Sequence, residues 1–213
     1  MMKPPLPLRT LGIVLLACAL GLGLGYLTWG RNGAAQEPTL PQALASGGDS
    51  WGAQNAPITI VEFGDYEDPF SRNFQQEIWP KLKEAFPNQI RLVFRDFPLI
   101  GIHPNAAPAA EAARCASEQG KFWAYHDLLF GSDAPLGSDT YVAYASQLKL
   151  DLARFQDCLS SGRGRQLVRR DFADAATLGL NATPTFFING LRLEGVQTYE
   201  GFLQIIEQIV GQP

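Results

Sequence analysis

Residues 58–95 contain a strand, a helix and a second strand joined by short connections, and this order restricts the fold more than any other feature of the chain. Residues 58–63 are β-branched and apolar, which is typical of a buried strand. A helix is predicted from Pro69 to about Ala85, and residues 90–95 form the next strand. The apolar residues of the helix recur every four positions and predict one buried face: Phe70, Phe74, Ile78, Leu82 and Phe86. Because strand–helix–strand units of this kind are right-handed with parallel strands, we predict the α/β class.

The rest of the chain is helical and then returns to β structure. Residues 104–178 have helical patterns throughout, and their Ala- and Leu-rich faces predict a helical subdomain. Residues 184–188 are a predicted strand, Asn189-Gly190 is a hairpin signal, and residues 191–194 pair back. An amphipathic helix is expected at about residues 198–210. The predicted fold is therefore a mixed sheet of at least four strands with a helical insertion.

The N-terminal 29 residues have the pattern of a membrane anchor. Basic residues within 1–9 precede an apolar run at residues 10–29, which is long enough to cross a bilayer as a helix. Because few basic residues follow the run, we expect the N-terminus in the cytoplasm and the remainder outside it. Residues 30–56 are rich in Gly, Ala, Pro, Ser and Gln and are predicted to be a flexible linker. The folded domain is then expected at residues 57–211.

Two other interpretations of the N-terminal segment remain open. A cleaved signal peptide is one, because the small residues Gly33-Ala34-Ala35 suit a cleavage site. A lipoprotein signal ending at Cys18 is the other, although apolar residues follow Cys18 where a polar tether is usual. All three interpretations place the domain outside the cytoplasm, in a periplasmic, extracellular or lumenal space.

Charge and cysteine content bear on partners and ligands. The net charge of −4 gives no basic excess to neutralise phosphates, so a nucleic-acid partner is not expected. Cys115 and Cys158 are the two cysteines of the folded part, and two such thiols usually pair outside the cytoplasm. Two separate buried thiols are the alternative. With two isolated cysteines and two histidines, no metal site is predicted.

Four stretches carry a resemblance to a known family. In chain order they are "VEFGDYEDPFSRNF", "RLVFRDFPL", "HPNAAPAAEAARCASEQGKFWAYHDLLF" and "ATPTFFING". They resemble the DsbA-like branch of extracytoplasmic thiol–disulfide oxidoreductases, over about residues 56–210. The resemblance implies a thioredoxin fold whose helical insertion is residues 104–178. A membrane anchor also resembles the tethered members of this branch.

The active-site turn departs from the family pattern. Where the family has Cys-Pro-x-Cys, this chain has Asp68-Pro69-Phe70-Ser71. The family's chemistry is thiolate attack on a disulfide, and neither a carboxylate nor a hydroxyl forms the mixed disulfide. We therefore predict a degenerate, redox-inactive turn that uses no cofactor. Asp68 and Pro69 are residue types favoured at the N-cap and first position of a helix, which gives Asp68 a structural role.

The resemblance also assigns roles outside the turn. Thr183 and Pro184 resemble the family's cis-proline loop, which holds an extended peptide by strand-like pairing. A polypeptide substrate or a specific protein partner is therefore expected. Cys115 and Cys158 match positions where related proteins carry an additional, structural disulfide. Redox activity through these two cysteines is the competing interpretation.

Three further chemistries remain open at the turn. A Ser71 nucleophile would need a base, for which Asp65, Glu67, Asp68 and His103 are the candidates nearest in sequence. The three acidic residues alone would form a site for a hard cation. The third is a glutathione-dependent transferase or isomerase, because kappa-class glutathione transferases share the fold and use Ser at the turn. In those enzymes, however, the key Ser aligns with Asp68.

Overall fold

The structure is a computed structural model that describes residues 42–210. The predicted anchor at residues 10–29 and its flanking residues 1–9 lie outside the described residues. Within residues 42–210, no helix is long and apolar enough to cross a membrane. The membrane anchor therefore stays a prediction from the sequence.

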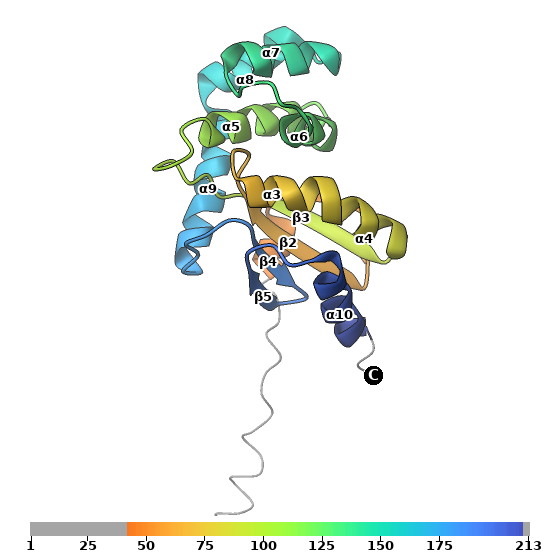
Figure 1. The fold of residues 1–213 in the computed structure, drawn as a ribbon. Coiled ribbons are helices and arrows are strands. Elements are labelled where there is room, and N and C mark those ends of the chain that lie inside the picture. The colour runs from red at the N-terminus through yellow and green to blue at the C-terminus, as the bar shows by residue number, and fades with distance from the viewer. Residues whose placement is uncertain (1–41, 211–213) are drawn as a thin grey trace, which may run out of the picture. The chain divides into compact units, whose positions relative to one another are not determined.

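A mixed five-stranded sheet lies at the centre of the domain (Figure 1). Its strands are β1 (Asp49–Trp51), β2 (Ile58–Gly64), β3 (Ile90–Asp96), β4 (Thr185–Ile188) and β5 (Leu191–Glu194). They are ordered β1-β3-β2-β4-β5, and only the β2–β3 pair is parallel. The predicted α/β class, the parallel pair and the C-terminal hairpin are confirmed.

Strand β1 lies in the segment that was predicted to be a linker. Helix α2 (Gln42–Ser46) and strand β1 lie within residues 30–56, which were predicted to be a linker with at most one helical turn, near residues 41–45. Leu44 is only 5% exposed and packs in a core cluster with Val61 and Phe63. Strand β1 reads Asp-Ser-Trp and has no apolar alternation, so its pairing with β3 could not be anticipated from its own sequence.

The helix predicted at residues 69–85 is formed in three consecutive pieces. They are α3 (Pro69–Asn73), the π-helix η1 (Phe74–Ile78) and α4 (Trp79–Ala85). Phe74, Ile78 and Leu82 are buried as predicted, but Phe70 is 57% exposed. Each four-residue step in an α-helix turns the face by about 40°, whereas a π turn accommodates the longer spacing. Phe70 precedes the π turn, and its predicted place on the buried face is wrong.

Helices cover both faces of the sheet. Phe74 of η1 packs with Phe202 and Ile206 of α10 (Tyr199–Val210) in one core cluster. A second cluster joins Ala175 of α9 to Phe187 of β4. The sheet is therefore buried between two layers, as its apolar strands predicted.

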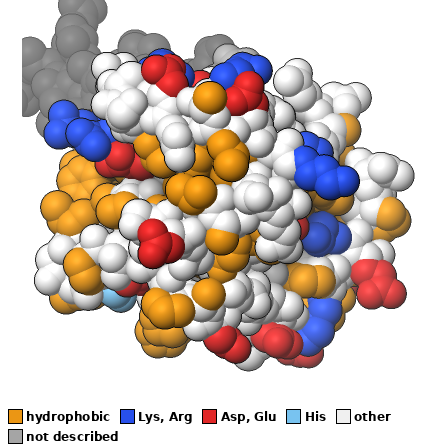
Figure 2. Space-filling model, turned by 90° about the horizontal axis from the view of Figure 1, so that it is seen from above, with side chains coloured by type: hydrophobic (Ala, Val, Ile, Leu, Met, Phe, Trp, Pro, Cys, Tyr) orange, Lys and Arg blue, Asp and Glu red, His pale blue; other side chains and the backbone are white. Residues whose placement is uncertain are grey.

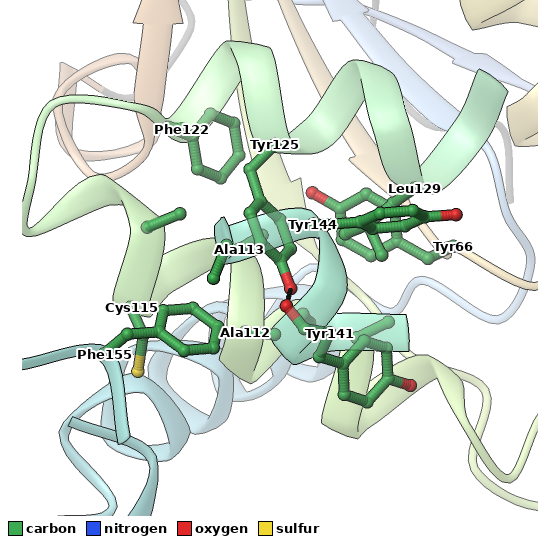
Figure 3. Close-up of a cluster of buried hydrophobic side chains, with 14 of the residues drawn as sticks. Tyr66, Ala112, Ala113, Cys115, Phe122, Tyr125, Leu129, Tyr141, Tyr144 and Phe155 are labelled. Carbon is green, nitrogen blue, oxygen red and sulfur yellow. Dashed lines mark hydrogen bonds between the residues drawn. The ribbon is translucent and has the colours of Figure 1, made fainter. Parts of the chain in front are cut away.

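The helical insertion predicted at residues 104–178 is formed and has its own core. Its helices are α5 (Ala106–Ser117), α6 (Phe122–Gly131), α7 (Ser138–Gln147), α8 (Leu152–Ser161) and α9 (Arg163–Thr177). Helices α5 to α8 stack beyond the sheet, and α9 extends back to it (Figure 1). In this core the Tyr125 hydroxyl donates to the carbonyl of Tyr141 over 2.8 Å (Figure 3).

A disulfide joins Cys115 of α5 to Cys158 of α8. The pairing expected from the sequence is therefore present in the structure. The two residues are 0% and 1% exposed, so the bond is part of the helical core. Closing a loop of 43 residues is worth about 4 kcal/mol by the loop-entropy argument.

A buried ionic network connects the helical subdomain to the sheet. The Arg114 guanidinium of α5 donates to Asp96 of β3, Asp49 of β1 and Asp171 of α9, over 2.5, 2.5 and 2.7 Å. Arg95 of β3 donates to the other oxygen of Asp171 over 2.8 Å. Four elements, α5, β3, β1 and α9, are thus joined by ion pairs that are largely buried.

Candidate functional site

Three segments meet at one end of the sheet. Asp96 at the end of β3 pairs with Gly64 at the end of β2, and Thr185 at the start of β4 pairs with Phe63. The turn after β2, the loop after β3 and the loop before β4 therefore leave the sheet at the same edge. The carboxyl ends of neighbouring strands are the usual place for a site in open α/β sheets.

Asp68 and Ser71 form a closed hydrogen-bonded unit at the start of α3. The Asp68 carboxylate accepts from the N–H groups of Phe70 and Ser71 over 3.2 and 2.8 Å, as an N-cap. The Ser71 hydroxyl donates to the same carboxylate over 2.7 Å and accepts from the N–H of Asp65 over 3.3 Å. Asp68 is 4% exposed and Ser71 is fully buried. The predicted cap is confirmed, and the hydroxyl is not presented as a nucleophile.

Asp65 fixes the loop after β3 to the turn. Its carboxylate accepts from the N–H of Glu67 over 2.7 Å and from the N–H of Leu99 over 2.8 Å. His103 Nδ1 lies 2.9 Å from the same carboxylate, which assigns the proton to Nδ1. The proposed base His103 is thus bonded to Asp65 and not to Ser71.

The acidic residues of the turn are all used within the protein. Glu67 accepts from the backbone N–H of Asn105 over 2.5 Å and from its side-chain amide over 2.9 Å. Asp65 and Asp68 have the partners described above. No group of three His, Cys, Asp or Glu in the described part of the chain could hold a metal ion. The cation site considered for these acids is not formed there.

Glu62 lies buried in β2, close enough to Asp68 for their charges to interact. Burial raises the pKa of Glu62 well above its ordinary value, the hydrogen bond from Gln75 lowers it, and the negative charge of Asp68 raises it. Gln75 donates to Glu62 Oε2 over 2.6 Å, while Oε1 has no partner among the described residues. Burial therefore favours the neutral form of Glu62. No motif marks Glu62 in the sequence, and its one signal is that it is an acid within an apolar strand.

The loop before β4 contains a cis peptide bond between Thr183 and Pro184. This bond was expected from the resemblance. The Pro184 carbonyl accepts from the N–H of Gly195 over 2.8 Å, which ties the loop to the residue that follows β5. Thr183 is 7% exposed, and neither its backbone groups nor its hydroxyl bond to any residue within 42–210. Its backbone N–H and C=O groups are thus unpaired, and its hydroxyl is buried without a partner among these residues.

Apolar side chains are exposed around this end of the sheet. Phe70 on the turn is 57% exposed, and Ile100 and Ile102 on the loop after β3 are 64% and 71% exposed. On the face seen from above, Figure 2 shows several hydrophobic patches with charged side chains between them. Large exposed apolar side chains in groups are typical of interaction surfaces.

Comparison with known proteins places this geometry in a family. Residues 46–208, well over half of the chain, match the family Thioredoxin_4, described as thioredoxin. The chain belongs to the thioredoxin family. A thioredoxin-like oxidoreductase from Silicibacter pomeroyi matches with a TM-score of 0.73 and 25% identity, covering 82% of this chain and all of that one. BdbD from Bacillus subtilis matches with a TM-score of 0.70 and 23% identity, covering 78% and 94%.

Other structural neighbours of this thioredoxin-family chain are DsbA-like thiol–disulfide exchange proteins. The α-DsbA1 of Wolbachia pipientis matches with a TM-score of 0.66 and 22% identity, covering 76% of this chain and 90% of that one. At this identity the likeness concerns the fold, which is the predicted thioredoxin fold.

Sequence relatives include proteins named for ion transport. The Na⁺/H⁺ antiporter NhaA 1 of Salinispora arenicola is 40% identical over 149 residues, which is 70% of this chain and 22% of the antiporter. The antiporter NhaA of Herminiimonas arsenicoxydans is 36% identical over 144 residues, again 22% of its length. The chain thus spans about a fifth of the length of these relatives.

Proposed function

We propose that this protein is a DsbA-like member of the thioredoxin family that is held at a membrane outside the cytoplasm and binds extended polypeptide segments without exchanging disulfides. The observation that carries the proposal is the Asp68–Ser71 hydrogen bond of 2.7 Å at the two positions where the family has thiols. Neither group forms a mixed disulfide. The alternative redox pair, Cys115 and Cys158, is bonded and buried, whereas exchange requires access to a sulfur.

The binding role rests on the loop before β4. An extended peptide adds to a sheet edge through its main chain, and it needs unpaired N–H and C=O groups on the protein. Thr183 supplies such groups. Phe70 and Ile102 supply exposed apolar contacts near the same end of the sheet. This combination supports capture of apolar, unfolded segments or of a specific partner.

A reduction assay with insulin and an oxidation assay with a dithiol peptide test the chemical part. We expect no turnover by the natural protein and appreciable turnover by the Asp68→Cys/Ser71→Cys double variant, because the scaffold and cis-proline loop are in place. Turnover by the natural protein that is lost in Cys115→Ser would contradict the proposal. Turnover that requires glutathione would instead favour the transferase alternative.

Peptide arrays and localisation experiments test the rest. Binding of apolar peptides should weaken in Phe70→Ser and should persist in Leu191→Ser, which removes another exposed apolar side chain on β5. Equal binding by both variants would count against this surface. Membrane fractionation, with protease added to intact cells, tests whether the domain is membrane-bound and accessible from outside.

A second candidate function follows from the antiporter relatives. A match of 149 residues must lie largely in the folded domain, because residues 1–41 are too few to contain it. This domain would then serve a Na⁺/H⁺ antiporter as an accessory part. A chimera of the Salinispora arenicola antiporter, carrying residues 42–210 in place of its matching region, should keep exchange activity in membrane vesicles. Loss of exchange in a stably inserted chimera would remove this candidate.

A further inference from the structure

A pocket lies between the loop after β3 and helices α5 and α9. Its volume is about 280 Å³, close to the lower end of the range for ligand pockets. Most of its wall is apolar, and charged side chains stand at one end. It is lined by Pro98, Ile100, Ala107, Glu111, Arg165, Val168, Arg169 and Phe172.

This pocket continues into a second one that reaches the cis-proline loop. The second pocket has a volume of about 350 Å³ and shares Pro98, Ile100 and Phe172 with the first. Its far end is formed by Ile102 and Asn181. We call the two pockets together the α9 groove. Because Asn181 is two residues before Thr183, the α9 groove ends beside the unpartnered backbone groups of that loop.

The apolar floor of the α9 groove is exposed and rigidly supported. Phe172 is 39% exposed, and its ring centroid lies 5.4 Å from that of Phe97, which is almost fully buried. Ile100 is 64% exposed on a loop whose preceding residue, Leu99, is bonded to Asp65. A fixed apolar surface of this kind binds apolar side chains with little loss of its own conformational entropy.

The charges at the α9 end leave one cation unpaired. Arg165 and Glu111 form an ion pair over 3.0 Å and largely neutralise each other. Arg169, one helical turn after Arg165 on the same side of α9, has no hydrogen bond or ion pair to any described residue. The neighbouring Arg170, by contrast, lies 3.9 Å from Asp171 and bonds to a backbone carbonyl. The α9 groove therefore presents a net charge of +1 at one end of an apolar floor.

We propose that the α9 groove binds an extended polypeptide segment with two or more apolar side chains and a Glu or Asp that pairs with Arg169. The proposal rests on the proposed peptide-binding function and names the sequence preference of that function. A polypeptide fits better than a compact small molecule because the two pockets share residues, are open and extend to Asn181, two residues before the unpaired main-chain groups of Thr183. An acidic residue fits because its negative charge would pair with Arg169, the cation of the α9 groove that has no partner among the described residues.

Fluorescence polarisation with three labelled peptides tests the preference. The peptides share an apolar extended sequence and differ at one position, which is Glu, Gln or Lys. The Glu peptide should bind about two- to fivefold more tightly than the Gln peptide, as expected for an exposed ion pair, and added salt should remove the difference. In Arg169→Gln the preference should vanish, and in Arg169→Glu it should pass to the Lys peptide. Arg163→Gln, an exposed arginine with partners elsewhere, is the matched control.

Phe172→Ser tests the apolar part separately. It should weaken the binding of all three peptides about equally, and Leu191→Ser is its control. Peptide binding that is unaffected by both Phe172→Ser and Arg169→Glu, but lost in Phe70→Ser, would overturn the α9 groove and leave the proposed function standing. No binding of any peptide would refute both. Binding of oleate by the α9 groove without binding of the peptides would also overturn the proposal.

Discussion

Replacing Arg114 with Met should show how strongly the fold depends on its buried ionic network. The side chain of Arg114 is 3% exposed and faces three carboxylates, those of Asp49, Asp96 and Asp171. Methionine fills much of the same volume and leaves these acids without their common cation. Breaking a buried pair by removing one partner costs about 3–5 kcal/mol, because the remaining charge stays desolvated.

The destabilisation caused by Arg114→Met should depend on pH, and the pKa shifts of the neighbouring acids give its direction. Burial raises the pKa of Asp96 to about 7 even though Arg114 lowers it, and burial also raises the pKa of Asp171. Without Arg114 both pKa values rise further. A carboxyl whose folded-state pKa is raised loses stability as pH increases through that pKa. The loss in Arg114→Met should therefore be smaller at pH 5, below the pKa of Asp96, than at pH 8, above it.

Chemical denaturation of both proteins at pH 5 and pH 8 measures this difference. Arg163→Met is the matched control, since Arg163 pairs with Glu118 and Asp157 over 2.9 and 3.0 Å but is 44% exposed. Exposed pairs of this kind contribute less than about 1 kcal/mol. If Arg114→Met costs no more than Arg163→Met at pH 8, or costs the same at both pH values, the network does not stabilise the fold in the way described.

Three other substitutions address different parts of the structure. Glu62→Gln replaces a buried acid whose pKa is raised. Relative to the natural protein, it should therefore stabilise the fold above pH 4.5, by up to about 1.4 kcal/mol per pH unit. Denaturation across pH 4–8 measures this slope. Gly164→Ala should lower the melting temperature, since the new Cβ would lie 2.6 Å from a backbone oxygen of α5, whereas Gly131→Ala meets nothing within 4 Å and should change it little. Cys115→Ser with Cys158→Ser should lower the free energy of unfolding by about 4 kcal/mol, and a loss below 1 kcal/mol would contradict the loop-entropy argument.

Local patterns in the sequence were sufficient for most of the fold. The strand at residues 58–63, the Asn189-Gly190 hairpin and the five helices of the insertion each have their own periodicity or turn signal. Strand β1 has none, because its place in the sheet depends on hydrogen bonds supplied by β3. The π turn at η1 has no local signal either; its Phe74 and Ile78 pack in one cluster with α10, and Phe70, which precedes it, is 57% exposed.

The site was less predictable than the fold because its chemistry depends on contacts between distant segments. The sequence identified Asp68 as a helix cap and Pro184 as a cis-proline, since both roles follow from local residue types or from the resemblance. It could not assign Asp65, whose carboxylate binds Leu99 and His103 more than 30 residues away. The three acids looked like a cation site until their hydrogen-bond partners were known.

Glu62 and Asp68 are both buried acids near the turn, but their surroundings affect ionisation in opposite directions. Asp68 lies at a helix N-terminus, where N–H groups and the helix dipole stabilise a negative charge. Glu62 has one amide donor and no cation beside it, and the charge of Asp68 further disfavours its ionisation. The surroundings of Asp68 thus favour a charge, and those of Glu62 disfavour one. A variant that removes Asp68 should consequently lower the pKa of Glu62, so the effects of substituting the two residues on stability will not add.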